Sequence, residues 1–167
     1  MKKLWTLVLA FALALGLSAC GGGTSSAPAK TYESTDQVVQ EVITVKVPKE
    51  LTSKESANWG GIELTQAGET WVLGISSGGL ENVNEKATWD AAVETWKQGY
   101  DYKDAKVAGK DGGRYDAGAA LNLVAPINDK VYLNIRVKDT ANDTPEARAK
   151  VLDKDIVKFV LANITTK

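Results

Sequence analysis

A run of alternating residues near the C-terminus constrains the fold more than any other feature of the sequence. Every second position from 131 to 137 is aliphatic: Val131, Leu133, Ile135 and Val137. This period of two is typical of a strand that buries one face. We predict a preceding strand over Arg114–Ala125, joined to this one by the short segment Pro126–Asp129. Because strands joined by a short turn run in opposite directions, this region predicts an antiparallel sheet.

Strand patterns also occur earlier in the chain. The predicted strands are Ile43–Val47, which ends at Pro48, Ile62–Thr65, Thr70–Ser76 and the shorter, weaker segment Lys106–Gly109. Turn-forming residues over Gln66–Glu69 separate the second and third of these, which indicates a hairpin. The sheet is therefore predicted to be largely antiparallel.

Two amphipathic helices are predicted. The first spans Glu85–Gln98, with Asn84 as its N-cap, Gly99 as its stop and Trp89, Ala92, Val93 and Trp96 on one face. The second begins with Thr144 as its cap and Pro145 as its first residue, and buries Ile156, Phe159, Val160 and Ile164. Such helices need a sheet face to cover. The sequence therefore predicts an α+β fold in which a largely antiparallel sheet is covered by two amphipathic helices.

This order of elements resembles the PsbP-like α/β/α sandwich. The resemblance covers residues 38–165 and includes the sequence Val45-Lys46-Val47-Pro48 at the end of the first strand and a helix at the C-terminus. It implies a sandwich fold and a role in binding or assembly. It carries over no site residue.

The N-terminus resembles the signal peptide of bacterial lipoproteins. Lys2 and Lys3 precede an apolar run from Leu4 to Leu17, and Leu17-Ser18-Ala19-Cys20 has the form of a lipobox. The run of about 14 apolar residues is shorter than the roughly 20 that a membrane-spanning helix needs. The resemblance implies cleavage before Cys20 and acyl chains, such as palmitate, attached to this residue. A spanning anchor and a signal peptide without lipid stay open as alternatives.

These features divide the chain into three parts. Residues 1–19 form the predicted signal peptide, residues 20–36 the lipidated cysteine and a flexible tether rich in glycine and serine, and residues 37–167 a single α+β domain. We expect the mature protein to be lipid-anchored on the cell membrane, facing outward from the cytoplasm. Its expected partners are membrane lipid, through Cys20, and an envelope protein or a cell-wall ligand.

Composition excludes several kinds of chemistry. The chain has no histidine and one cysteine, so histidine-dependent triads and histidine–zinc sites are excluded, as is thiol catalysis once Cys20 is lipidated. The balance of 20 basic and 21 acidic residues argues against nucleic acid. No cofactor or metal is expected, and a binding or accessory role is favoured over catalysis.

The alternative is a carboxylate-dependent hydrolase acting on cell-envelope polymers, since glycosidase chemistry needs only two carboxyl groups. Glu63, Asp90 and Glu94 are available for it.

A loop with Asp139, Asn142 and Asp143 offers oxygen ligands for calcium, but it lacks the spacing of a known calcium loop. Gly74–Gly78 has the form G-x-S-x-G, and we expect a Ser/Gly loop leaving a strand because no histidine can activate its serine.

Exposed aromatic residues are the best candidates for a binding site. Trp59 lies beside two glycines in a predicted turn, and Tyr100 and Tyr102 follow the end of the first helix. We predict that these three rings are partly exposed and contact a sugar, a peptide or a protein partner. Trp89 and Trp96 are expected in the core.

Overall fold

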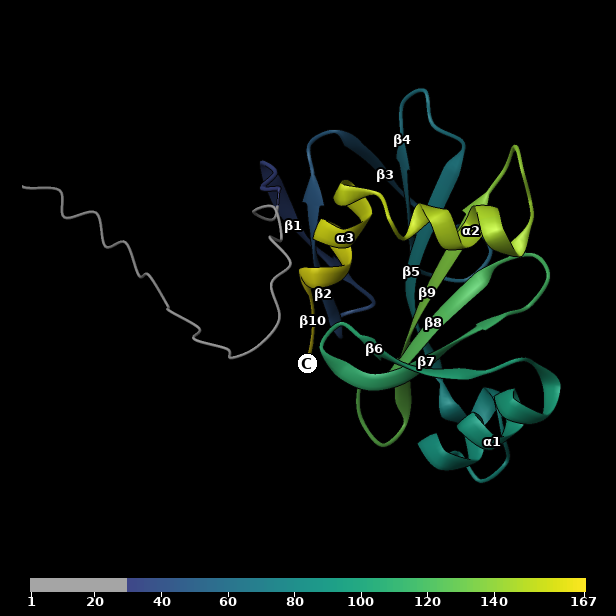
Figure 1. The fold of residues 1–167 in the computed structure, drawn as a ribbon. Coiled ribbons are helices and arrows are strands. Elements are labelled where there is room, and N and C mark those ends of the chain that lie inside the picture. The colour runs from purple at the N-terminus through teal and green to yellow at the C-terminus, as the bar shows by residue number, and fades with distance from the viewer. Residues whose placement is uncertain (1–29) are drawn as a thin grey trace, which may run out of the picture.

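Ten strands in two antiparallel sheets dominate residues 30–167, the part of the chain that the computed structural model describes. The predicted signal peptide and Cys20 lie outside the described residues, as does most of the predicted tether (Figure 1). The first strand, β1, begins at Ser34, within the range 20–36 assigned to the tether.

The larger sheet has seven strands in the order β3-β4-β5-β9-β8-β7-β6, and all neighbouring strands are antiparallel. These strands are β3 Leu51–Glu55, β4 Ile62–Gln66, β5 Trp71–Gly79, β6 Lys103–Val107, β7 Lys110–Asp116, β8 Leu121–Pro126 and β9 Val131–Asp139. The smaller sheet has the order β1-β2-β10, with β1 Ser34–Val39, β2 Ile43–Pro48 and β10 Ile164–Thr166.

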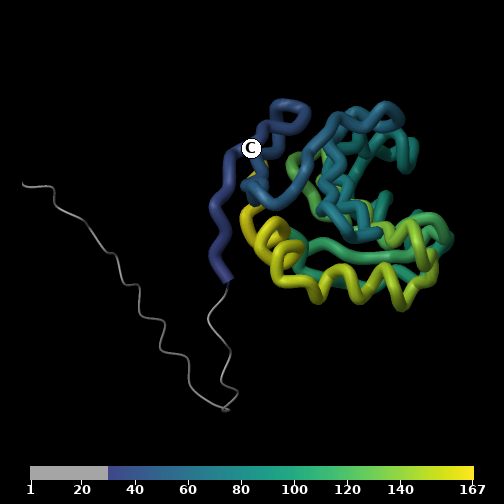
Figure 2. The backbone as a smooth tube through the Cα atoms, turned by 90° about the horizontal axis from the view of Figure 1, so that it is seen from above, coloured from purple at the N-terminus to yellow at the C-terminus, as the bar shows by residue number. Residues whose placement is uncertain are grey.

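Helices lie on both sides of the larger sheet. α2 (Pro145–Val151) and α3 (Asp155–Ala162) follow each other along one side, whereas α1 (Trp89–Gly99) lies at the far end, after a 3-10 turn over Leu80–Asn82 (Figures 1 and 2). The main core lies between the sheet, β2 and the α2–α3 pair, and contains the alternating aliphatic residues of β5 and β9. The prediction of an α+β fold with a largely antiparallel sheet is confirmed.

The predicted strand Arg114–Ala125 is divided in the structure. Its first residues belong to β7 and its last to β8, because the chain turns between them. Oδ1 of Asp116 accepts a hydrogen bond of 2.8 Å from the backbone N–H of Gly118. Gly118 has a φ of +79°, which glycine adopts without strain. The strand predicted over Lys106–Gly109 lies earlier than expected, since Ala108 and Gly109 form the tip of the β6–β7 hairpin.

Both predicted helices differ from the observed ones in their bounds, and Gly99, the predicted stop of the first, is the last residue of α1. α1 begins at Trp89, later than predicted, because Thr88 is its N-cap and accepts a hydrogen bond from the N–H of Ala91 at 3.3 Å. The second helix begins as predicted, with Thr144 as its cap, but a turn after Val151 divides it into α2 and α3. Ile164, which was assigned to this helix, lies in β10.

The segment Gly74–Gly78 lies inside β5, so the expected loop is wrong. The side chain of Ser76 is buried in the sheet, and its hydroxyl donates a long hydrogen bond of 3.5 Å to the carbonyl of Asn134. Ser76 is therefore a structural residue of the sheet. A nucleophile elbow would instead require the serine at a sharp turn after the strand.

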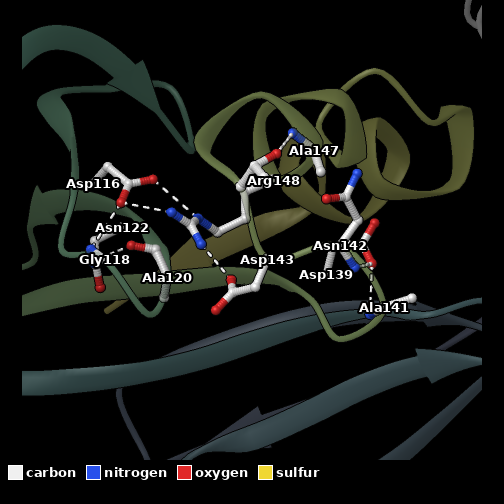
Figure 3. Close-up of polar contacts among 11 residues, drawn as sticks. Asp116, Gly118, Ala120, Asn122, Asp139, Ala141, Asn142, Asp143, Ala147 and Arg148 are labelled. Carbon is white, nitrogen blue, oxygen red and sulfur yellow. Dashed lines mark hydrogen bonds and ion pairs between the residues drawn. The ribbon is translucent and has the colours of Figure 1, made fainter.

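A buried arginine fixes α2 to the turn between β7 and β8. Arg148 is 1% exposed, and its Nε and Nη2 atoms donate to the two oxygens of Asp116 at 3.0 and 2.9 Å (Figure 3). Its Nη1 atom pairs with Asp143, in the loop before α2. Burial lowers the pKa of Arg148, but the hydrogen bonds with Asp116 and Asp143 outweigh burial, so its pKa is raised. The position of α2 therefore depends on a fully paired charge.

Candidate functional site

A cluster of aromatic side chains lies between α1 and the larger sheet. Trp96 of α1 is at its centre, and its ring centroid lies 5.6 Å from that of Trp89. On the sheet side, the centroids of Tyr132 and Tyr115 lie 5.3 and 5.6 Å from Trp96. The helical period places Trp89 and Trp96 on the same face of α1. This face packs on the sheet, as expected for the two tryptophans.

Two of the three predicted binding residues join this cluster. Tyr102 stacks on Trp96 with 6.3 Å between the centroids, and Tyr100 stacks on Tyr115 at 4.8 Å. Tyr100 is 44% exposed. It is the C-cap of α1, so the end of this helix positions its ring at the surface. The cluster thus presents tyrosine rings at the surface on a rigid support.

A groove of about 710 Å³ opens beside Tyr102, between α1 and the β6–β7 hairpin. Its apolar lining includes Trp89, Val93 and Tyr102. Its charged residues come from both walls: Asp90, Glu94 and Lys97 from α1, and Asp104, Lys106 and Asp111 from the hairpin. A groove with aromatic walls and a few polar groups is typical of a ligand site.

The groove has an excess of negative charge. Lys106 pairs with Asp111 at 2.6 Å, and Nζ of Lys97 lies 3.9 Å from Glu94. Asp90 and Asp104 form no ion pair with any residue in the range 30–167. These two carboxylates, one on each wall, are available to accept hydrogen bonds from a ligand.

Tyrosines of the aromatic cluster have raised pKa values. Burial is the main cause for Tyr102, Tyr115 and Tyr132, because it disfavours the phenolate. The negative charge of Asp104 raises the pKa of Tyr102 further. All three residues therefore stay neutral over the physiological pH range.

Trp59, the third predicted binding residue, lies outside the aromatic cluster. Its indole covers Gly74 of β5 and Gly61, the residue before β4: a Cβ on Gly74 would lie 2.4 Å from its Cη2 atom, and one on Gly61 2.6 Å from its Cζ3 atom. Only glycine leaves space for the ring at these two positions. The guanidinium of Arg136 lies 5.8 Å from the ring centroid. The structure thus separates Trp59 from Tyr100 and Tyr102.

The carboxylates of the hydrolase alternative do not form one site. Glu63 lies on β4, where it accepts a hydrogen bond of 3.3 Å from Ser56 and pairs with Lys54 at 3.3 Å. Asp90 and Glu94 lie in the groove, where both are exposed. A general acid of a glycosidase is typically enclosed by apolar groups that favour its protonated form. The exposed carboxylates of the groove are therefore suited to binding a ligand rather than to acting as a general acid.

In the loop considered for calcium, the carboxylate oxygens accept hydrogen bonds from other residues of the protein or form an ion pair with one. Oδ1 of Asp139 accepts a hydrogen bond from Thr70 Oγ1 at 2.8 Å. It also accepts hydrogen bonds from the N–H groups of Ala141 and Asn142 at 3.1 and 3.2 Å, and Figure 3 shows these residues beside it. The bond from Thr70 is the main cause of the lowered pKa of Asp139. Asp143 pairs with Arg148. Within residues 30–167 no group of three or more acidic, histidine or cysteine side chains is placed to hold a metal ion.

Sequence reasoning did not select Tyr115, Tyr132 or Arg136. A signal for two of them was present, because Tyr132 and Arg136 alternate with the aliphatic residues of β9 and so share its opposite face. Only the strand order shows that Tyr115, on β7, reaches the same face through the intervening strand β8.

Comparisons with known proteins concern the fold. No protein-family model matches the sequence, and no curated protein matches it. Among solved structures, the chain is similar to the solution structure of cyanobacterial PsbP (CyanoP) from Synechocystis sp. PCC 6803. The two are 11% identical, the match covers 86% of this chain and 98% of that chain, and the TM-score is 0.46. The element order of the sequence resembles the same family.

No helix between residues 30 and 167 has both the length and the apolar character needed to cross a membrane.

Proposed function

We propose that this chain is a lipid-anchored binding protein of the bacterial cell envelope, attached through Cys20, and that its ligand occupies the groove between α1 and the β6–β7 hairpin. The groove itself is the observation that carries the proposal. It joins aromatic surface from Trp89 and Tyr102 to free carboxylates on opposite walls, Asp90 and Asp104.

The groove chemistry favours a sugar chain of the cell wall as the ligand. Sugar rings pack through their C–H groups on aromatic residues, and Trp89 and Tyr102 line the groove. Sugar hydroxyls donate hydrogen bonds, which the exposed carboxylates of Asp90 and Asp104 can accept. The excess of carboxylates over lysines disfavours a polyanion in the groove.

The groove is tested by removing its free charges without changing its shape. We expect the double variant Asp90→Asn/Asp104→Asn of the full-length chain to bind soluble cell-wall oligosaccharides about tenfold more weakly in calorimetry, because two charged acceptors become neutral. The matched control is Asp129→Asn/Asp153→Asn, which neutralises two exposed carboxylates outside the groove. Equal affinities of the two double variants would refute the groove as the site. Release of shorter products by the native chain alone would favour the hydrolase.

The anchor is tested separately. We expect Cys20→Ser to abolish labelling by a fatty acid and to leave the protein either soluble or as an uncleaved precursor, because serine lacks the sulfur that carries the lipid. Ser25→Ala, in the predicted tether, is the control and should fractionate with membranes as the native chain does. Unchanged labelling and membrane fractionation of Cys20→Ser would refute a lipid anchor at this residue.

A further inference from the structure

Arg136 is a half-buried arginine of the sheet that lies without a counter-charge. Arg136 of β9 is half-buried, and it makes no ion pair and no side-chain hydrogen bond with any residue between 30 and 167. Residues 1–29 contain no Asp or Glu. Every acidic side chain of the protein therefore lies in the described part, and none of them pairs with Arg136. Withdrawing a charge from water without a partner is unfavourable.

The sheet places this guanidinium beside Trp59. Arg136 lies opposite Gly74 on one neighbouring strand and opposite Asn122 on the other, and Asn122 lies opposite Tyr115. The indole of Trp59 covers Gly74 and reaches within 5.8 Å of the guanidinium. The positive charge of Arg136 also lowers the pKa of Tyr115, although burial is the stronger effect and raises it. Trp59 is thus the aromatic neighbour that lies next to the charge.

The contact with Trp59 leaves the hydrogen-bonding capacity of Arg136 unused. A cation–π contact is made with the positive charge of the group and does not satisfy its five N–H donors. A guanidinium beside an aromatic ring keeps these donors in a planar fork that matches a carboxylate or a phosphate. Next along the same face of β9, the Oδ1 atom of Asn134 is buried and has no hydrogen-bond partner among the described residues. Two polar groups of this face, those of Arg136 and Asn134, therefore have no hydrogen-bond partner among residues 30–167.

We propose that Arg136, supported by Trp59, forms a binding site for an oxyanion, either a carboxylate or a phosphate group of a ligand. The guanidinium supplies two parallel N–H donors to two oxygens of the anion, and Trp59 holds its plane. This site is separate from the groove, which has an excess of carboxylates, and the proposal does not depend on the groove being occupied. It explains why a half-buried arginine has no internal partner.

Titration with small anions tests this site. The full-length chain in detergent is titrated with inorganic phosphate and with glucuronate, and with glucose as a neutral match for glucuronate. The readouts are calorimetric affinity and the NMR signal of the Arg136 side-chain N–H. We expect one or both anions to bind and to shift this signal, and glucose to leave it unchanged. The tighter anion identifies whether the site is built for phosphate or for carboxylate.

Variants separate a built site from general charge attraction. Arg136→Gln should weaken anion binding about tenfold or more, and Arg136→Lys should weaken it less, since lysine keeps the charge and loses the fork. The control Arg114→Gln removes an exposed arginine of β7 that also lacks an ion pair within residues 30–167, and it should bind as the native chain does.

Two results would overturn the proposal. One is the absence of any shift of the Arg136 signal with either anion; the other is an equal loss of affinity in Arg114→Gln and Arg136→Gln. If Arg136→Gln does not fold, as judged by circular dichroism, the NMR titration of the native chain decides the question alone.

Discussion

Two arginines of this protein show how differently one residue type can be used. Arg148 is buried and makes three ionic hydrogen bonds to Asp116 and Asp143, so each of its three guanidinium nitrogens has an acidic partner inside the fold. Arg136 lies against Trp59 and has no acidic partner within residues 30–167. The first arginine joins elements of the structure, and we infer that the second contributes to ligand binding.

Removing an acidic partner of Arg148 should destabilise the protein more than removing Arg148 itself. Asp116→Asn should lower the free energy of unfolding by about 3 kcal/mol, because it leaves a buried guanidinium with half of its charge partners. Arg148→Met should cost less, because it removes the buried charge itself and leaves Asp116 and Asp143, which are partly exposed. Urea unfolding of both variants measures the difference. A larger loss for Arg148→Met would contradict this account of the ion pairs.

At the scale of elements, strands were predictable where one face is buried and the residues alternate. The predicted cores of β2, β4, β5 and β9 are present because each alternates in burial or is largely buried. β3 and β1 were missed because they lie at sheet edges, where exposed polar residues such as Lys54 weaken the period of two. The short β10 was hidden in a helical pattern, because Ile164 continues the spacing of α3 although its backbone pairs with β2.

The candidate site was predictable only in part, for a topological reason. Tyr100 and Tyr102 are close in sequence and follow α1, so local reasoning placed them together. The opposite wall of the groove is the hairpin that follows, of which only a short strand was predicted. The partners Tyr115 and Tyr132 come from strands whose order in the sheet the sequence does not reveal. Trp59 was grouped with the tyrosines on exposure alone, and the sheet places it on Gly74 instead. Spacing predicts which residues share a face, whereas strand order decides which faces meet.

At the scale of the whole molecule, the buried tyrosines make stability depend on alkaline pH. Folding raises the pKa of Tyr102, Tyr115 and Tyr132 above the value of 10.0 that is ordinary for tyrosine. The folded state therefore holds these protons more tightly than the unfolded state does. Their contribution is fully present below pH about 10 and is lost as the pH rises through the folded-state values.

We expect the free energy of unfolding to fall as the pH rises above about 10, by up to about 1.4 kcal/mol per pH unit for each such proton. Denaturant unfolding over a series of pH values, with phenolate absorbance followed in parallel, measures this dependence. Tyr115→Phe removes one of the protons and should make the decline shallower. A decline of equal slope in this variant would assign the effect to other groups.

The place where the chain enters the domain has a consequence for orientation. Tyr32 packs edge-on against Phe159 of α3, with 5.2 Å between the ring centroids, so the chain enters beside β1 and α3. In both views of the backbone, α1 lies on the opposite side of the molecule (Figures 1 and 2). A domain held to a bilayer by its N-terminus, as proposed, would be attached on its α3 side, at the opposite end from the groove. The contact between Tyr32 and Phe159 would then set the point of attachment, and the flexible tether would leave the groove free to meet ligands away from the lipid.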